Sequence, residues 1–337
     1  MKKLNIAING FGRIGRAAAK IIINRFPGMN IVAINDLTDA GTLAHLMQYD
    51  SCYGRYEKIV TATKDSIVVN GHKIPVLAIK DPSLLPWKKL NVDVVLECTG
   101  RFTNKEDLSL HLKAGAKKVI LSAPAKKGGV KTFVIGVNEK KLLKNDNLIS
   151  CASCTTNCLA PATMVIKDKF GIKNALMSTV HAYTADQNLV DGPHKDLRRA
   201  RGAAINIVPT TTGAAISVTE IMPSLKGKFD GMAIRVPVPV GSLCDVTFLL
   251  NKKTTIEAVN AEFIKASKGK LKGVLEASNE ELVSSDIIGN SHSSIVDLRS
   301  TALVGGNLLK VVAWYDNEWG YSNRFVELAD YVKKFIK

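Results

Sequence analysis

The sequence has few aromatic and few acidic residues for its length of 337 residues. Aromatic side chains make up 6% of the chain and are not interleaved with a basic stretch, which argues against a dedicated RNA-binding surface. Asp and Glu number 30 against 46 Lys and Arg, so the formal net charge is +16. This excess favours anionic partners (nucleic acid, a membrane surface or phosphorylated small molecules) without choosing among them. Most of it lies in residues 1–153, which carry 24 basic and 12 acidic side chains.

Long apolar runs and a dense set of cysteines are also absent. No stretch of about 18 uncharged apolar residues occurs, so no membrane span is expected. Six cysteines in 337 residues are too sparse for a disulfide framework, and the beginning, MKKLNIAINGFGRIG, is not typical of a signal peptide. We therefore expect a cytoplasmic protein. The content of 46% apolar and 23% charged residues is ordinary for a packed chain, and the length favours two domains.

The first half of the chain alternates short apolar strands with helical segments. Residues 4–9, LNIAIN, are rich in Ile and end at a glycine, which is typical of a buried strand. A helical spacing over 12–25 and a second strand over 31–35 follow, and this β-α-β order predicts a parallel sheet. Further expected segments are strands at 92–97, 119–122, 132–136 and 148–150, helices at 39–49 and 105–115, and a hairpin around Asn70-Gly71.

The pattern changes near residue 150. A helix is expected over 153–170, with a kink or an end at Pro161 because proline lacks the backbone donor that a helix interior needs. The polar and basic block 188–201 is long enough to form a functional loop. The remaining expected segments are strands at 175–182, 232–236, 243–250 and 308–315 and helices at 213–222, 256–267 and 322–336.

A glycine-rich motif, GFGRIG at residues 10–15, joins the first strand to the first helix. Glycines at such a turn let the backbone approach a pyrophosphate, whose charge the helix N-terminus favours. Asp36 ends the second strand, where a carboxylate can accept hydrogen bonds from an adenosine ribose. Because Asp36 would repel a 2′-phosphate and Leu37 offers no cation, the pattern favours NAD over NADP. The alternative is a glycine-rich turn that binds no ligand.

Three cysteines lie close together in CASCTTNC at residues 151–158. Cys151 and Cys154 have the spacing of half a zinc site, but no second such pair and no HxxxH follows, so no metal is expected. Burial as small apolar side chains is a further interpretation, especially for Cys98 and Cys244. Cys154 lies at a strand-to-helix junction, where free N–H groups and the helix dipole would stabilise a thiolate. This position therefore indicates a nucleophile.

A cysteine nucleophile usually needs a histidine partner. Among the six histidines, His181 ends a buried strand, and strand ends are where open α/β folds place their chemistry. His45 and His111 lie on expected helices and are interpreted as packing or surface residues, while His72 falls in a hairpin turn and His194 in the basic loop. His181 is therefore the candidate partner, and a structural role for it stays open.

Two regions could bind anions. The segment 210–213 is rich in hydroxyl groups and precedes a helix, where N–H groups could hold a phosphate, and Arg235 lies on a strand of apolar neighbours, where arginine needs an anion. The alternatives are a solvated charged surface for the basic loop and a structural ion pair for Arg235. The cations of the loop are Lys195, Arg198, Arg199 and Arg201.

Six motifs stand out along the chain: NGFGRIGR at 9–16, ASCTTNCLAP at 152–161, HAYT at 181–184, RRAR at 198–201, PTTTGAA at 209–215 and WYDNEWGYS at 314–322. Taken together, these motifs resemble those of the phosphorylating glyceraldehyde-3-phosphate dehydrogenases. The resemblance runs from residue 4 to the terminal helix, and the signature around Cys154 is its most specific part.

The resemblance implies a fold, an activity and an assembly. It implies an α/β fold with a Rossmann-type parallel-sheet domain that binds NAD at 1–153, and an α+β catalytic domain with a mainly antiparallel or mixed sheet at 154–317. The terminal helix, 318–337, would pack back on the first domain. The implied protein is a cytoplasmic homotetramer of glycolysis that uses NAD, glyceraldehyde 3-phosphate and inorganic phosphate.

The resemblance also implies roles for single residues. Cys154 is the implied nucleophile, in preference to Cys151 or Cys158, and His181 is the implied base. The implied ligands of the substrate C3 phosphate are Thr184, Arg199 and Arg235, and those of the incoming phosphate are Ser153, Thr155, Thr212 and Gly213. The implied NAD contacts are Gly10, Phe11, Gly12, Arg13, Ile14, Asp36, Thr99, Ser122 and Asn317.

Two further functions stay open. Erythrose-4-phosphate dehydrogenases share these motifs, although Tyr321-Ser322 after Trp319-Gly320 favours the three-carbon substrate. Binding of RNA, another polyanion or a surface could be an additional role, because the resemblance does not account for the charge of +16. The chain also departs from the family signature at Cys151, where Asn is frequent.

Overall fold

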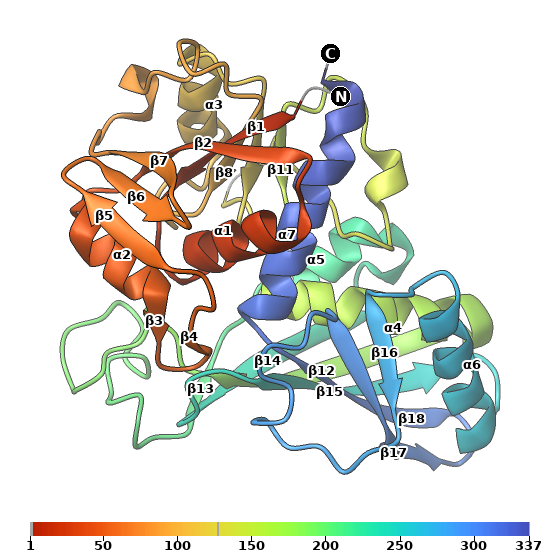
Figure 1. Cartoon of the computed structure of the whole chain (residues 1–337). Coiled ribbons are helices and arrows are strands. Elements are labelled where there is room, and N and C mark those ends of the chain that lie inside the picture. Colours follow the sequence, from red (N-terminus) through yellow and green to blue (C-terminus); the bar gives the residue numbers. More distant parts are fainter. Residues whose placement is uncertain (1–2, 127, 337) are drawn as a thin grey trace. The chain divides into compact units, whose positions relative to one another are not determined.

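The computed structural model describes residues 3–126 and 128–336 and divides the chain into two units (Figure 1). The first unit contains the described residues up to Phe133, Glu139–Ala152 and the residues from Ser322 onward. The second unit contains Val134–Asn138 and Ser153–Tyr321. The chain therefore passes from the first unit to the second beside Cys154. The assignment of residues 1–153 with 318–337 and of residues 154–317 to two functional domains stays a prediction.

The first unit is built on a nine-stranded sheet with the order β10-β11-β9-β8-β1-β2-β7-β6-β5. Neighbours from β10 to β7 pair in parallel, whereas β5, β6 and β7 pair antiparallel. The strands are β1 Leu4–Asn9, β2 Met29–Asn35, β5 Val60–Thr63, β6 Ser66–Val69, β7 His72–Leu77, β8 Val94–Glu97, β9 Lys118–Leu121, β10 Lys131–Thr132 and β11 Leu148–Ser150. A separate ribbon pairs β3 Tyr49–Asp50 with β4 Gly54–Arg55.

Helices connect the parallel strands. Every residue of β8 and β9 is buried, as expected of parallel strands that are covered on both faces. The helices are α1 Arg13–Arg25 after β1, α2 Ala40–Gln48 after β2, α3 Lys105–Lys113 after β8 and the terminal α7 Trp319–Val332, with short 3-10 turns η1 Pro82–Leu84, η2 Glu139–Lys141 and η4 Lys333–Phe335. The expected parallel sheet is confirmed.

The expected hairpin lies between β6 and β7. Asn70 and Gly71 form its turn with φ angles of 47° and 81°. Positive φ at both central residues matches the right-handed twist of the flanking strands, and Asn followed by Gly tolerates this conformation best. The sequence signal and the structure therefore agree on the turn.

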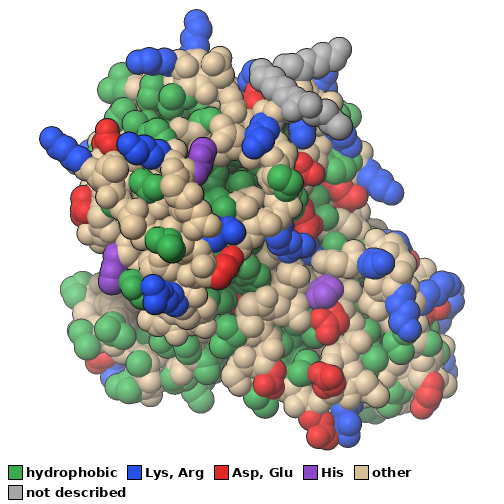
Figure 2. All heavy atoms as spheres, viewed as in Figure 1, with side chains coloured by type: hydrophobic (Ala, Val, Ile, Leu, Met, Phe, Trp, Pro, Cys, Tyr) green, Lys and Arg blue, Asp and Glu red, His purple; other side chains and the backbone are tan. Residues whose placement is uncertain are grey.

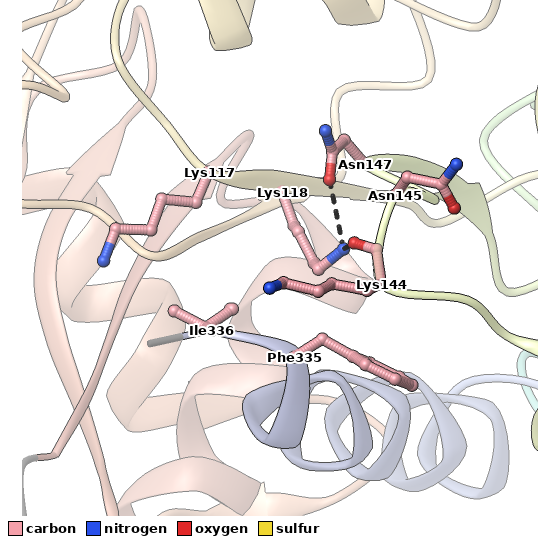
Figure 3. A pocket seen from close by; sticks show the side chains of 7 residues that line it. All are labelled: Lys117, Lys118, Lys144, Asn145, Asn147, Phe335 and Ile336. Atoms are coloured by element: carbon pink, nitrogen blue, oxygen red, sulfur yellow. Dashed lines mark hydrogen bonds between the residues drawn. The ribbon is translucent and has the colours of Figure 1, made fainter.

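A basic pocket of about 420 Å³ lies in the first unit between η4 and the segment before β11 (Figure 3). Lys118 is 2% exposed, and its ammonium donates to Lys144 O, Asp146 O and Asn147 Oδ1 over 2.9, 2.9 and 3.1 Å. Its neighbour Lys117 pairs with Asp93 at 2.7 Å. These two cations therefore stabilise the fold, because their charges already bind the protein's own oxygen atoms.

The second unit is built on a seven-stranded sheet with the order β13-β14-β12-β15-β18-β17-β16. The pairs β12-β14 and β16-β17 are parallel and the other neighbours are antiparallel, so the expected mixed sheet is confirmed. The strands are β12 Ile172–Ala182, β13 Val208–Thr210, β14 Phe229–Val236, β15 Ser242–Leu250, β16 Leu275–Ser278, β17 Ser294–Val304 and β18 Leu308–Tyr315. The helices are α4 Cys154–Phe170, α5 Ala214–Ile221 and α6 Ile256–Lys268, with the 3-10 turn η3 Pro223–Leu225.

The two faces of this second sheet differ. The helices α4, α5 and α6 pack on one face, and burial alternates along β15 as it does in a strand with one covered side. On the uncovered face, Leu176 of β12 and Met232 of β14 are 69% and 41% exposed. The 183–207 loop, which joins β12 to β13, adds the exposed side chains Leu189, Val190, Leu197, Ile205 and Ile207. Figure 2 shows hydrophobic side chains gathered at the lower left, where Figure 1 draws this loop.

Two local expectations differ from the structure. The helix α4 continues through Pro161, so the expected end there is wrong, while the expected kink stays a prediction; burial of most residues of α4, Pro161 included, offsets the lost backbone hydrogen bond. The strand expected at 132–136 is limited to Lys131–Thr132, because the chain turns at Gly136, where φ is 83°. In the described part of the chain, no helix has the length and apolar character that crossing a membrane requires.

Candidate active site

Cys154 is the first residue of α4, and Ser153 caps this helix. The Ser153 hydroxyl accepts a hydrogen bond from the Thr156 N–H at 3.1 Å, so the serine side chain satisfies one of the free donors of the first turn. The Cys154 sulfur consequently lies at the positive end of the helix dipole. The local sequence thus places a thiol where negative charge is favoured.

His181 faces this thiol from β12. Its Nε2 lies 3.4 Å from Cys154 Sγ, and its Nδ1 lies 2.7 Å from Ala182 O. A carbonyl oxygen only accepts hydrogen bonds, so we assign the proton to Nδ1. The lone pair of Nε2 then points to the thiol, and the structure brings the two predicted catalytic residues together.

The surroundings of this pair set its protonation. Burial and, to a smaller extent, the nearby Arg235 charge lower the pKa of His181 to about 3, so the imidazole is neutral at pH 7. Burial also raises the pKa of the Cys154 thiol, while the charge of Arg235 opposes that rise. The arginine therefore favours the thiolate over the thiol.

Tyr315 at the end of β18 holds the cysteine segment in place. Its hydroxyl lies 2.9 Å from Thr155 Oγ1 and 2.9 Å from Thr179 Oγ1, and its ring meets the His181 ring edge-on at 5.9 Å between centroids. The Thr179 hydroxyl donates to Leu243 O at 3.0 Å, so Tyr315 donates to Thr179 and Thr155 donates to Tyr315. The predicted phosphate ligand Thr155 is thus 4% exposed and bonded inside the protein. Sequence reasoning missed Tyr315, although it lies within the WYDNEWGYS motif.

Arg235 of β14 reaches the same place from the next strand. It pairs in register with His181, and its Nη1 donates to Ala182 O at 3.0 Å and to Thr184 Oγ1 at 3.2 Å. Among the described residues, its buried Nε finds no hydrogen-bond partner. The structure therefore brings Thr184 and Arg235 together, with a buried donor that an anion would satisfy.

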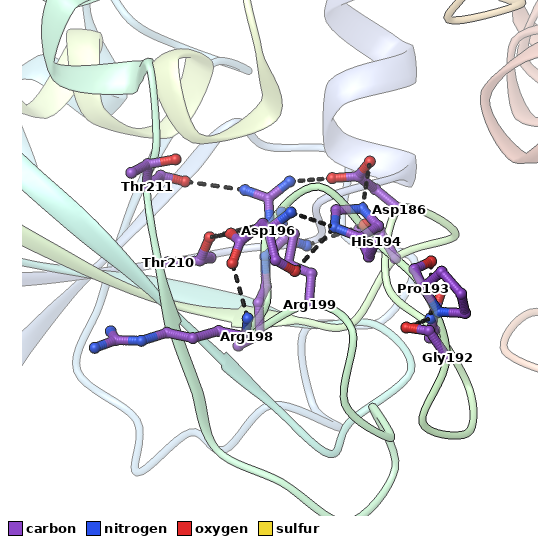
Figure 4. Close-up of polar contacts among 12 residues, drawn as sticks. Asp186, Gly192, Pro193, His194, Asp196, Arg198, Arg199, Thr210 and Thr211 are labelled. Atoms are coloured by element: carbon purple, nitrogen blue, oxygen red, sulfur yellow. Dashed lines mark hydrogen bonds and ion pairs between the residues drawn. The ribbon is translucent and has the colours of Figure 1, made fainter.

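Arg199 lies in the 183–207 loop and is held by the protein itself (Figure 4). Its Nε donates to Thr210 Oγ1 at 3.0 Å, its Nη2 donates to Thr211 O at 3.2 Å, and its Nη1 pairs with Asp186. The predicted phosphate ligand is thus in place, but a carboxylate that sequence reasoning missed already contacts it.

Thr212 and Gly213 form the N-terminal end of α5. Gly213 is the N-cap residue, and the Thr212 hydroxyl accepts from the Ala214 N–H at 3.2 Å. A side chain at Gly213 would meet no atom within 4 Å, so the space beside this helix end is open. The end of α5 can therefore receive an anion.

The first unit contains a cavity of about 560 Å³ at the carboxyl ends of its parallel strands. This edge is where open α/β sheets bind ligands. The lining includes Asn9, Gly10, Gly12, Asn35, Asp36, Leu37, Ile79, Lys80, Asp81, Cys98, Thr99, Arg101 and Phe102.

The residues of this cavity fit a dinucleotide. A Cβ at Gly10, where φ is +90°, would lie 2.7 Å from the Thr99 nitrogen, and one at Gly15 would lie 2.2 Å from Gly10 O. A Cβ at Gly12 would instead meet nothing within 4 Å, which leaves the N-terminal end of α1 open to a pyrophosphate. Asp36 accepts from Phe11 N–H at 2.7 Å and from Thr38 N–H at 3.0 Å, so its carboxylate is fixed for a ribose.

Other residues predicted to contact NAD do not line this cavity. The Arg13 side chain pairs with Asp50 at 2.7 Å, and Ser122 and Ile14 are not among the residues that line the cavity. Asn317 belongs to the second unit, where its Oδ1 accepts from Gly241 N–H and Ser242 Oγ–H, each at 3.0 Å. Because both bonds occupy the amide oxygen, the Asn317 NH₂ group is the end left for a ligand.

A buried polar network that sequence reasoning missed supports the cavity floor. Glu97, which is 0% exposed, accepts from the Thr99 N–H at 2.8 Å and from Asn9 Nδ2 at 2.6 Å. The Trp87 indole donates to His111 Nδ1 at 3.0 Å, so His111 Nε2 donates to Glu97 at 3.0 Å. The sequence suggested that His111 is a packing or surface residue. The structure shows that it is buried, and its hydrogen bond orients Glu97.

Among the described residues, no group of three or more His, Cys, Asp or Glu side chains could hold a metal ion. The cysteines at 151–158 do not converge on such a centre, since Cys158 Sγ lies inside the second unit within contact distance of Ser294 Oγ and Ala313 O, at 3.9 and 3.7 Å.

Comparisons with known proteins show which family the chain resembles. Residues 4–105 match the family model of the glyceraldehyde 3-phosphate dehydrogenase NAD binding domain, and residues 153–317 match that of the C-terminal domain. Glyceraldehyde-3-phosphate dehydrogenase 1 of Bacillus subtilis (strain 168) is 53% identical over 332 residues, which are 98% of each chain. The glyceraldehyde-3-phosphate dehydrogenases of Geobacillus stearothermophilus and Mycobacterium avium are each 52% identical, over 98% and 99% of both chains respectively.

Proposed function

The chain belongs to the glyceraldehyde-3-phosphate dehydrogenase family, and from this premise we propose that it converts D-glyceraldehyde 3-phosphate, NAD and inorganic phosphate into 1,3-bisphosphoglycerate and NADH in glycolysis. It is an NAD-dependent oxidoreductase. The observation that carries the mechanism is the 3.4 Å contact between Cys154 Sγ and His181 Nε2, with Nδ1 tied to Ala182 O.

In the proposed mechanism, Cys154 supplies the nucleophile. His181 Nε2 takes the thiol proton as the sulfur bonds to the aldehyde carbon, and it passes this proton to the aldehyde oxygen, which gives a thiohemiacetal. His181 then takes the hydroxyl proton, while the Cys154 N–H at the helix end stabilises the oxygen as negative charge develops. NAD, when bound, supplies the acceptor for the hydride that leaves this carbon. The product on Cys154 is a thioester, which inorganic phosphate cleaves to release the acyl phosphate and the thiol.

Two phosphate groups need two sites. We assign the C3 phosphate of the substrate to Thr184, Arg199 and Arg235, because a buried donor of Arg235 is left for an anion. The incoming phosphate falls to the ends of α4 and α5, where Ser153, Thr212 and Gly213 present hydroxyl and N–H groups. Thr155 contributes to that site through its backbone, since its hydroxyl is bonded to Tyr315.

NAD would be held by Gly10, Gly12 and Asp36 in the cavity of the first unit, with Thr99 fixed beside Gly10 by Glu97. Phe11 does not line this cavity, but its N–H donates to Asp36 and would hold that carboxylate in position. Asp36 disfavours the 2′-phosphate of NADP. The Asn317 NH₂ group would donate to the carboxamide of the nicotinamide. Residues 1–153 with 318–337 thus form the proposed cofactor domain, and residues 154–317 form the proposed catalytic domain.

The direct test compares two cysteines of the same signature. Cys154→Ser should abolish oxidation of glyceraldehyde 3-phosphate while NAD binding, measured by fluorescence quenching, stays unchanged. Cys151→Ser is the matched control and should stay active, since Cys151 belongs to the first unit. An active Cys154→Ser variant would exclude Cys154 as the nucleophile. An inactive but folded Cys151→Ser variant would mean that the nucleophile was assigned to the wrong cysteine.

Substrate choice needs a separate measurement. We compare kcat/KM for glyceraldehyde 3-phosphate and erythrose 4-phosphate, with and without inorganic phosphate, and expect preference for the three-carbon aldehyde and dependence on phosphate. Phosphate-independent oxidation of the four-carbon aldehyde would favour an erythrose-4-phosphate dehydrogenase.

Polyanion binding is a possible additional role only if free cations are available for it. In the basic pocket, Lys117 and Lys118 are already engaged by protein oxygens. Heparin binding measured between about 50 and 200 mM salt tests this role, because contacts with phosphate or sulfate groups weaken steeply over that range.

A further inference from the structure

Two carboxylates of the 183–207 loop contact Arg199 in different ways (Figure 4). Asp196 Oδ2 accepts from the Thr210 hydroxyl at 2.6 Å and lies 3.4 Å from Arg199 Nε, while its Oδ1 accepts from the Arg198 N–H at 2.9 Å. Both of its oxygens are therefore fixed by the loop. Asp196 thus acts as an anchor that, with Thr210, sets the position of the guanidinium.

Asp186 is held much less firmly. Its side chain is 52% exposed, and one of its oxygens pairs with Arg199 Nη1. Its other oxygen lies 3.9 Å from His194 Nε2, which is beyond hydrogen-bond range. A carboxylate that is half exposed and bonded through one oxygen can move away from its partner at small cost.

Asp186 faces the pocket to which the C3 phosphate is assigned. The charges of Arg199 and Asp186 both act on Arg235, where Arg199 lowers the pKa of the guanidinium and Asp186 raises it. Arg235 in turn donates to Thr184, so Thr184, Arg199, Arg235 and Asp186 surround one region. An anion that accepts the Arg199 Nη1 hydrogen now bonded to Asp186 must take the place of this carboxylate.

We propose that Asp186 is a displaceable counter-ion that sets the affinity of this pocket for the phosphate of the substrate. Without substrate it neutralises Arg199, and on binding the phosphate replaces it while Asp196 and Thr210 keep the guanidinium in place. This inference rests on the proposed function, because it takes a phosphorylated aldehyde as the ligand. An unphosphorylated aldehyde carries no charge to displace Asp186, so the exchange also selects for the phosphate group.

The test measures the Kd of glycerol 3-phosphate, which carries the same phosphate and no aldehyde, for the NAD-bound enzyme by calorimetry. Asp186→Asn removes a negative charge beside a dianion at a partly exposed site, so we expect a Kd about three- to tenfold lower, with a smaller gain at high salt. Asp196→Asn loosens Arg199 and should raise the Kd. Asp191→Asn is the matched control, because Asp191 lies in the same loop, is 60% exposed and pairs with Arg201 at 2.7 Å; its Kd should equal that of the wild type.

Kinetics separate this inference from the proposed function. In Asp186→Asn the KM for glyceraldehyde 3-phosphate should fall, while kcat/KM for unphosphorylated glyceraldehyde stays the same. An unchanged or higher Kd in both Asp186→Asn and Asp186→Ser, with wild-type turnover intact, would overturn the counter-ion role alone. A wild-type enzyme that binds glycerol 3-phosphate and fails to oxidise the aldehyde would overturn the proposed function alone.

Discussion

The histidine of the candidate site is shaped by what surrounds it. His181 is 4% exposed and faces Arg235, so its protonated form is disfavoured in the folded protein. A free histidine has a pKa of about 6.5, and burial together with the Arg235 charge lowers that of His181 to about 3. The same arrangement that keeps the imidazole neutral as a base therefore links stability to pH.

His181→Asn tests both consequences. Activity should fall by about 10²–10⁴-fold, the range typical of a lost general base. In the wild type, the unfolded chain binds a proton below about pH 6.5 that the folded chain does not, so stability is complete above that pH and decreases as the pH falls toward 3. By pH 4.5 this loss amounts to about 2–3 kcal/mol, and the Asn variant should lack it.

The measurement is urea unfolding at pH 7 and pH 4.5, with the exposed His45→Asn as control. The control should show the same acid loss as the wild type. If His181→Asn loses as much stability between pH 7 and pH 4.5 as the control does, the His181 imidazole is already protonated in the folded state. The assignment of His181 as a neutral base would then fail.

At the residue scale, the sequence allowed us to predict functional residues that lie within motifs. It did not allow us to predict residues whose role depends on contacts between distant parts of the chain. Cys154 and His181 could be proposed from a helix start and a strand end. Tyr315 meets Thr155 across 160 positions of sequence, and Asp186 contacts Arg199 only because the loop folds back. Such contacts depend on strand order, which local spacing does not contain.

At the scale of elements, the turn between β1 and α1 allows a sharp comparison of two glycines. Gly10 has φ of +90° and no room for a Cβ beside Thr99, whereas Gly12 has φ of −71° and open space. We expect Gly10→Ala to destabilise the protein by about 1–3 kcal/mol through backbone strain, with a further cost from the clash. Gly12→Ala should keep its Tm and weaken NAD binding, because the methyl group fills the approach to the helix end.

Thermal unfolding without NAD and NAD titration separate these outcomes. A Gly10→Ala variant with the wild-type Tm would contradict the strain argument. Wild-type NAD affinity in Gly12→Ala would mean that the pyrophosphate lies elsewhere than the N-terminal end of α1.

Element boundaries could be predicted where a short, mostly apolar run stood out from its neighbours, and prediction failed where polar residues divided the run. The strands Leu4–Asn9, Leu148–Ser150 and Leu308–Tyr315 have the bounds that the sequence predicts. The long strand β17, Ser294–Val304, was not predicted, because polar residues interrupt it and its register shifts between Asp297 and Ala302. Continuity of α4 through Pro161 likewise depends on packing rather than on local preference.

At the scale of the whole molecule, the excess positive charge is only partly explained. Lys118 shows one use of it, since its buried ammonium ties together three oxygen atoms. Arg199 and Arg235 show a second use of the positive charge, because they are proposed ligands of the substrate phosphate. The charge of +16 therefore does not by itself require a polyanionic partner.

The homotetramer stays a prediction, and the uncovered face of the second sheet is the surface through which we expect copies to associate. Leu176 and Met232 lie on neighbouring strands of this face, and the 183–207 loop exposes five further large aliphatic side chains. Monomers rarely expose apolar groups in such numbers, and a symmetric interface between copies would cover them. Light scattering coupled to gel filtration should give about four times the chain mass of 36.4 kDa.

Leu176→Glu tests which surface holds the copies together. In a symmetric interface each substitution brings a second copy of the new charge close to the first, so the tetramer should dissociate to smaller species. Leu84→Glu is the matched control, since Leu84 is 70% exposed on η1 of the first unit and should leave the mass unchanged. Circular dichroism must show that both variants are folded. A wild-type monomer at micromolar concentration would exclude the tetramer, and an intact tetramer in Leu176→Glu would place the interface away from the face that β12 and β14 leave uncovered.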